Sequence, residues 1–90
     1  MELEHIYCLV EGQELIAEAI TKGRTDYDMP NWNRQVVYSL DGSKAIVEGH
    51  FDEEEIAWFN ANGYVFSGAE ECRQYLQANY TEWYPPYVGD

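Results

Sequence analysis

Two runs of strand-forming residues on either side of Asp41-Gly42 constrain this fold more than any other feature of the sequence. Residues 35–40 read Gln-Val-Val-Tyr-Ser-Leu, and residues 44–51 read Lys-Ala-Ile-Val-Glu-Gly-His-Phe. β-Branched and aromatic residues favour strands, and Asp-Gly between two such runs is a strong signal for an antiparallel hairpin. The turn has either two or three residues, so the register stays open. In both cases Gly42 is expected to adopt a positive φ angle.

A further strand and a short helix are predicted before the hairpin. Residues 5–10 form a short apolar run that is typical of a buried strand. Apolar residues then recur with helical spacing, which predicts a helix over residues 13–22. Lys22 and Gly23 are suitable residues for the last turn and the end of this helix.

Two more helices are predicted after the hairpin. The tetrapeptides 52–55 and 67–70, Asp-Glu-Glu-Glu and Ser-Gly-Ala-Glu, both match the capping box of a helix start. They predict helices over residues 52–62 and 68–83. We therefore expect an α+β fold, with a small, mostly antiparallel three-stranded sheet and two or three helices packed mainly on one face.

The length of 90 residues predicts a single domain, in which residues 84–90 form an extended C-terminal tail. Cys8 and Cys72 both lie in apolar stretches, so they are expected to be buried free thiols. The N-terminal residues lack a basic segment followed by an apolar one, as a secretory signal would have. From these features we expect a cytoplasmic location.

The sequence contains no recognisable catalytic, cofactor-binding or metal-binding motif. Neither His5 nor His50 has a second ligand at the spacing of a zinc site, because a strand would point His5 and Cys8 to opposite faces. Asp26 and Asp28 lack the glycine and the bidentate glutamate of a calcium loop. We therefore assign no catalytic residue, cofactor or metal, and favour a non-enzymatic protein, with catalysis as the open alternative.

The acidity of the chain indicates the kind of partner. Seventeen acidic residues against five basic ones give a formal net charge of −12, yet 16% of the residues are aromatic, which is unlike an acidic disordered tail. Such a charge repels nucleic acid and anionic membranes and attracts a basic protein surface. Acidic residues on the predicted helix faces and helix starts, with Trp58 beside them, are the expected partner-binding residues: Glu11, Glu14, Glu18, Glu53, Glu54, Trp58, Glu70 and Glu71.

Within this set, Glu14 and Glu18 repel each other at i, i+4, and we expect no basic residue near them. Trp58 is expected either to be exposed as an interface residue or to be buried under a neighbouring segment. The partner is thus a basic protein, with no direct contact to nucleic acid or membrane, and homo-oligomerisation is left open. In size and charge alone, the chain is similar to the inhibitors and nucleic-acid mimics that viruses direct against host enzymes.

A second hypothesis concerns residues 24–34, which are too long and too irregular for a simple connection. This segment contains Asp, Pro and Asn together with Met29 and Trp32. It could cover the edge of the core, or it could form the aromatic site of a small-molecule-binding or small catalytic domain.

Overall fold

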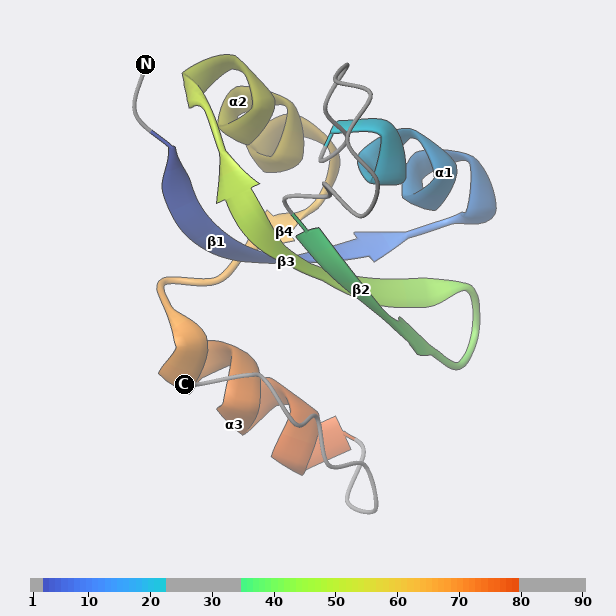
Figure 1. The fold of residues 1–90 in the computed structure, drawn as a ribbon. Helices are drawn as coiled ribbons and strands as arrows, with labels where there is room; N and C mark the ends of the chain where they lie inside the picture. Colours follow the sequence, from blue (N-terminus) through green and yellow to red (C-terminus); the bar gives the residue numbers. More distant parts are fainter. Residues whose placement is uncertain (1–2, 23–34, 80–90) are drawn as a thin grey trace.

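The computed structural model describes residues 3–22 and 35–79, which form one four-stranded antiparallel sheet and three helices (Figure 1). The α+β class is thus confirmed. The strands lie in the order β2-β3-β1-β4. The elements in chain order are β1 (Glu4–Glu11), α1 (Gln13–Lys22), β2 (Gln35–Leu40), β3 (Lys44–Phe51), α2 (Glu53–Asn62), β4 (Tyr64–Val65) and α3 (Ala69–Asn79).

The β2–β3 hairpin is confirmed, and the structure selects one of the two registers. Leu40 is opposite Lys44, so the loop has three residues. Gly42 has the expected positive φ of 65°, and Ser43, a residue that rarely adopts this conformation, has a φ of 61°. The Ser43 carbonyl accepts a hydrogen bond from the amide of Gly12 (2.8 Å), which ties the loop to the turn before α1.

The short strand β4 was not predicted. It pairs with β1 through Val65 opposite Cys8 and Tyr64 opposite Leu9. Two residues carry too little periodicity to be recognised as a strand in the sequence. β4 nevertheless completes the sheet and leads the chain from α2 on one face to α3 on the other.

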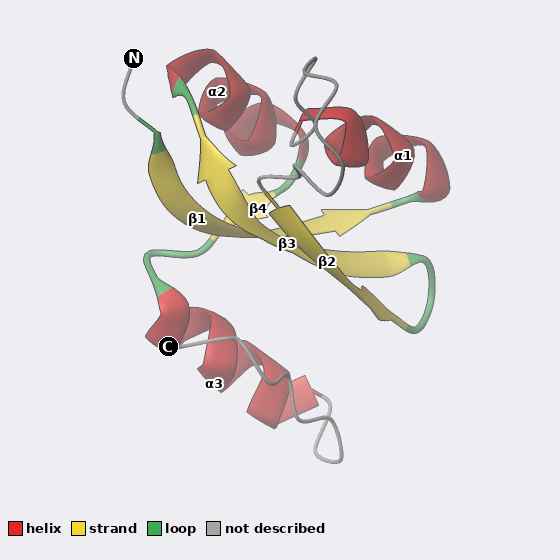
Figure 2. Ribbon diagram, viewed as in Figure 1, coloured by secondary structure: helices red, strands yellow, loops and turns green. Residues whose placement is uncertain are grey.

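Helices cover both faces of the sheet (Figure 2). α1 and α2 pack on one face, as expected, and α3 lies on the opposite face. The reason is that β1 and β3 place apolar side chains on both sides. The first buried cluster, under α1 and α2, contains Ile6, Cys8, Val10, Ala19, Val47, Phe51 and Phe59. The second, under α3, contains Tyr7, Tyr38, Ile46, Phe66, Cys72 and Leu76.

The predicted start of α2 is confirmed. The Asp52 side chain accepts a hydrogen bond from the amide of Glu55 (2.8 Å), and the Glu55 carboxylate accepts one from the amide of Asp52 (2.8 Å). This reciprocal pair satisfies two amides that have no partner within the helix.

The predicted capping box of α3 is wrong by one residue. The Gly68 carbonyl accepts the first helical hydrogen bond, from the amide of Cys72 (3.2 Å), so the helix begins one residue later than expected. As a result, the Glu71 carboxylate, rather than that of Glu70, accepts from the amide of Ser67 (2.6 Å).

Both cysteines are buried free thiols, as predicted. Burial raises the pKa of each thiol to about 12, and for Cys72 the nearby carboxylates of Glu48 and Glu71 contribute as well. Within residues 3–22 and 35–79, no helix has the length and apolar character needed to cross a membrane. Three expectations lie outside the described residues: the 24–34 loop, the end of the third helix at 80–83, and the 84–90 tail.

Candidate functional site

The first acidic group begins at one end of the sheet and continues along α1. Glu11 ends β1, and Glu14 and Glu18 are exposed on α1. The expectation that no base lies near them is wrong for Glu18, because Lys22 Nζ is 3.7 Å from its carboxylate. Lys44, on the neighbouring strand β3, is the pairing partner of Glu11. The charge of Glu18 is therefore partly compensated, and a basic residue faces Glu11 on the neighbouring strand.

The acidic start of α2 lies at the other end of the sheet. Glu53 and Glu54 are exposed and follow the last residue of β3, Phe51, which pairs with Glu4 at the start of β1. Glu11 is seven residues further along the same strand. At about 3.3 Å per residue, roughly 23 Å separates the two ends.

Glu70 and Glu71 belong to α3, on the opposite face of the sheet (Figure 1). The eight predicted partner-binding residues therefore do not form one continuous ridge. They form three groups, which are Glu11, Glu14 and Glu18 at the end of β1 and on α1, Glu53, Glu54 and Trp58 on α2, and Glu70 and Glu71 in the first turn of α3. The topology explains this grouping. β1 and β3 are antiparallel, so α1 and α2 start at opposite ends of the sheet, and α3 lies on the other face.

Trp58 lies between the two helices of the first face. Its side chain is half-buried, its ring meets Phe59 edge-on with centroids 5.1 Å apart, and Lys22 Nζ lies 5.0 Å from the ring centroid. A cation over an aromatic face is a favourable contact. Trp58 therefore joins α2 to α1, and only part of its surface is left for a partner.

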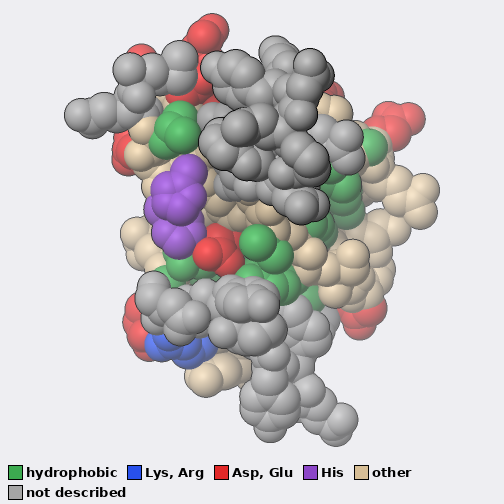
Figure 3. Space-filling view, viewed as in Figure 1, with side chains coloured by type: hydrophobic (Ala, Val, Ile, Leu, Met, Phe, Trp, Pro, Cys, Tyr) green, Lys and Arg blue, Asp and Glu red, His purple; other side chains and the backbone are tan. Residues whose placement is uncertain are grey.

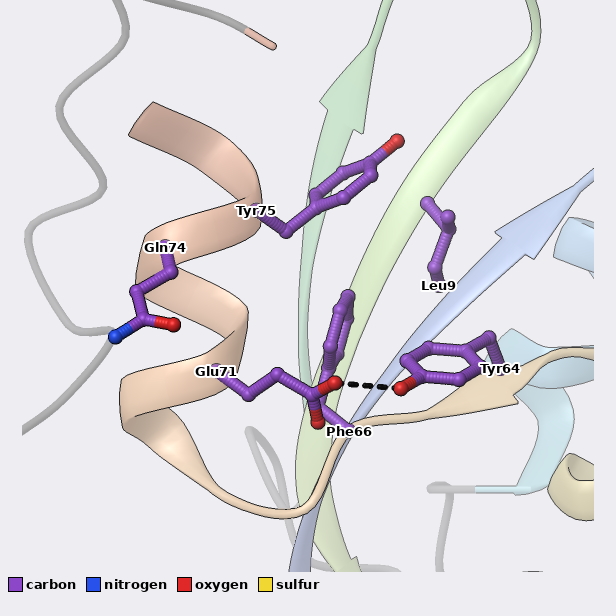
Figure 4. A pocket seen from close by; sticks show the side chains of 6 residues that line it. All are labelled: Leu9, Tyr64, Phe66, Glu71, Gln74 and Tyr75. Atoms are coloured by element: carbon purple, nitrogen blue, oxygen red, sulfur yellow. Dashed lines mark hydrogen bonds between the residues drawn. The ribbon is translucent and has the colours of Figure 1, made fainter. Parts of the chain in front are cut away.

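The structure contains a groove that the sequence analysis missed, between β4 and α3 (Figure 4). Its volume is about 480 Å³. The lining residues come from β1, from β4 and the segment after it, and from two turns of α3: Leu9, Tyr64, Phe66, Glu71, Gln74 and Tyr75.

Three aromatic rings shape the groove. Phe66 is buried, and its ring meets those of Tyr64 and Tyr75 with centroids 5.0 and 5.6 Å apart. Tyr64 is 52% exposed. The groove thus presents an aromatic surface to solvent.

Glu71 is the acidic group of this groove and is held in place from two sides. Its Oε2 accepts a hydrogen bond from the Tyr64 hydroxyl (2.5 Å), and its Oε1 accepts one from the amide of Ser67 (2.6 Å). The Ser67 amide and then the Tyr64 hydroxyl lower the pKa of Glu71, and the same carboxylate raises the pKa of Tyr64. Glu71 is therefore a fixed negative charge at neutral pH.

A second polar cluster lies on the same face of the sheet, where Figure 3 shows the histidines beside an acidic side chain. His5 and His50 are opposite each other on β1 and β3, with their rings stacked at 4.4 Å. Glu48 lies 2.9 Å from His5 Nε2 and accepts a hydrogen bond from the Tyr38 hydroxyl (3.0 Å). His5 and Cys8 point to opposite faces, as predicted.

No group of three or more His, Cys, Asp or Glu side chains within residues 3–22 and 35–79 is arranged to hold a metal ion. The chain matches no known protein family, no curated protein and no solved structure. The function must therefore be argued from the geometry of the described surfaces.

The sequence did carry a signal for the groove. Tyr64 and Phe66 are two residues apart, which places them on one side of an extended segment, and Glu71 and Tyr75 are four apart on one face of a helix. Strand β4 itself has no signal in the sequence. Only the pairing of β4 with β1 turns this segment toward α3.

Proposed function

We propose that this protein is a non-enzymatic acidic domain that docks on a basic surface of another protein. The observation that supports the proposal is the way in which charges are paired. In the described part of the chain, Lys22 and Arg73 form ion pairs with Glu18 (3.7 Å) and Glu70 (2.7 Å). The third basic residue of that part, Lys44, is the strand partner of Glu11. The remaining exposed carboxylates leave a surface with excess negative charge, to which a basic protein is complementary.

A finer proposal concerns what docking would achieve. A basic surface that receives an acidic group is often one that binds nucleic acid, so the domain would act as an inhibitor or nucleic-acid mimic of the viral type. The free thiols of Cys8 and Cys72 suit a reducing compartment, which supports a cytoplasmic site of action.

Affinity capture from the native host, with identification by mass spectrometry, tests the proposal. The captured protein should be basic, and its binding should weaken steeply between about 0.05 and 0.3 M salt, because surface charges are screened over this range. If the partner binds nucleic acid, an oligonucleotide should compete with the domain. Capture of a partner that is acidic, or that is retained unchanged at the higher salt, would contradict the proposal.

Three matched variants identify which acidic group makes the contact. Each neutralises two carboxylates of one group without a large change in side-chain shape: Glu14→Gln with Glu18→Gln, Glu53→Gln with Glu54→Gln, and Glu70→Gln with Glu71→Gln. At least one pair should reduce both the affinity and the salt dependence, while the others serve as controls for net charge. Equal affinity for all three pairs and the wild type would show that charge complementarity does not drive binding.

A further inference from the structure

The groove between β4 and α3 combines aromatic walls with one fixed carboxylate. Phe66 forms its buried part, and Tyr64 and Tyr75 meet the Phe66 ring from two sides. The faces of aromatic rings attract cations, and flat cations stack on them with the largest contact area. The described residues that line the groove include no lysine or arginine that could occupy this position.

Glu71 provides the complementary negative charge. Its oxygens accept hydrogen bonds from the Tyr64 hydroxyl and the Ser67 amide, and the Ser67 side chain also hydrogen-bonds the carboxylate. A carboxylate has about four acceptor positions, so these three donors leave it able to accept a further hydrogen bond. Because the carboxylate is already oriented, a ligand would lose little free energy in ordering it.

The neighbouring acid is placed differently, which makes it a natural control. Glu70 lies outside the groove lining and pairs with Arg73 at 2.7 Å. The two glutamates are adjacent in the sequence and in the same helical turn, but only Glu71 lines the groove, where it points toward Tyr64 (Figure 4).

We propose that this groove binds an arginine side chain presented by the partner protein. The guanidinium is flat, stacks on tyrosine rings and donates parallel N–H groups that match a carboxylate, whereas the lysine ammonium is compact and strongly hydrated. The inference deepens the proposed function, since it rests on the partner being basic, and it identifies the residue type that Glu71 recognises.

Titration with blocked amino acids, followed by NMR of the labelled protein, tests the groove without knowledge of the partner. N-acetyl-arginine amide should shift the resonances of Tyr64, Phe66, Glu71 and Tyr75. N-acetyl-citrulline amide has nearly the same shape without the charge and should bind at least about tenfold more weakly, the difference expected when a charged hydrogen bond is lost. N-acetyl-lysine amide should also bind more weakly than the arginine compound.

Variants then identify the groups responsible. Glu71→Gln should reduce the affinity for N-acetyl-arginine amide about tenfold, and Tyr64→Phe, which keeps the ring but frees the carboxylate, should reduce it less. Glu70→Gln should leave it unchanged. Thermal unfolding of each variant establishes that the protein is still folded. The comparison of the arginine and citrulline compounds uses the wild type alone, so it tests the groove even where a variant fails to fold.

Several results would overturn the inference: equal binding of arginine and citrulline compounds, tighter binding of lysine, shifts confined to α1 and α2, or full affinity in Glu71→Gln. These results are distinct from failure of the proposed function. A groove that selects arginine while affinity capture yields no basic protein contradicts only the docking proposal, and a basic partner bound without loss in Glu71→Gln contradicts only the groove.

Discussion

The two faces of the sheet differ in how their side chains are used. Under α1 and α2, Cys8, Val10, Phe51 and Phe59 are completely buried, in a cluster made of apolar side chains. Under α3, tyrosines take much of the space, and their hydroxyl groups reach carboxylates at the edge of the cluster. Tyr38 donates to Glu48 in this way, and Tyr64 donates to Glu71.

This difference determines how much of each cluster reaches the surface. A closed apolar cluster contributes free energy of folding but offers nothing to a partner. A tyrosine-rich cluster can be buried at its rings and polar at its ends, which is why such residues are common at interfaces. Both clusters contain completely buried side chains, but the second one opens into the groove.

The largest expected effect comes from removing a buried aromatic ring from the first cluster. Phe59→Ala should lower the free energy of unfolding by about 3–5 kcal/mol, because a fully buried ring is lost and leaves a cavity. Tyr64→Ala, on the second face, should cost only about 1–2 kcal/mol, since half of that side chain is exposed. Urea unfolding measures both values. If they were equal, the second face would be as closely packed as the first.

Gly63→Ala should be the next most damaging change, at about 2 kcal/mol. A Cβ atom at this position would lie 2.6 Å from the Leu9 carbonyl oxygen and 2.8 Å from Cys8 Sγ, so α2 could no longer approach β1 so closely. The backbone of Gly63 is extended, with φ of −151°, so the effect is one of packing. Unfolding unchanged within error would show that the first face tolerates a shift of α2.

Gly42→Val should destabilise both faces to the same extent, by about 1–2 kcal/mol. The cause is the positive φ of 65° in a loop where an added Cβ would meet no neighbour. Amide exchange in α1 and α3 should accelerate by a similar factor, because the hairpin serves both clusters. Gly42→Asn is the control, since asparagine tolerates this conformation and should cost little. Acceleration in α3 alone would indicate that the two faces unfold separately.

The smallest effect concerns the two thiols, one in each cluster. The pKa of each is raised to about 12 in the folded protein, whereas the unfolded thiols ionise from about pH 9. The contribution of the protonated thiols to the free energy of unfolding is therefore fully present below pH 9. It is lost as the pH rises, by roughly 1 kcal/mol per thiol near pH 10. Cys8→Ala and Cys72→Ala should each remove about half of the loss in unfolding free energy that the two thiols cause above pH 9, as measured by urea unfolding at a series of pH values. Rapid reaction of either thiol with a labelling reagent at about pH 8, without denaturant, would contradict its burial.

The sequence by itself determined the elements whose signals are local. The capping box of Asp52 and Glu55 and the Asp41-Gly42 turn involve residues within a few positions of one another, and both were predicted correctly. The helix over residues 13–22 and the three longer strands were also predicted, because their periodicity extends over several residues. The same local reasoning misplaced the start of α3 by one residue, since Gly68 rather than Ser67 provides the first carbonyl.

Only the tertiary structure decided how the elements are combined. β4 exists because Tyr64 and Val65 pair with residues more than fifty positions earlier, and this pairing brings Tyr64 to the carboxylate of Glu71. The separation of the acidic residues into three groups follows from the antiparallel order of β1 and β3 and from α3 crossing to the other face. Charge and spacing along the chain contain no information about such distances, because they arise from contacts between segments far apart in sequence.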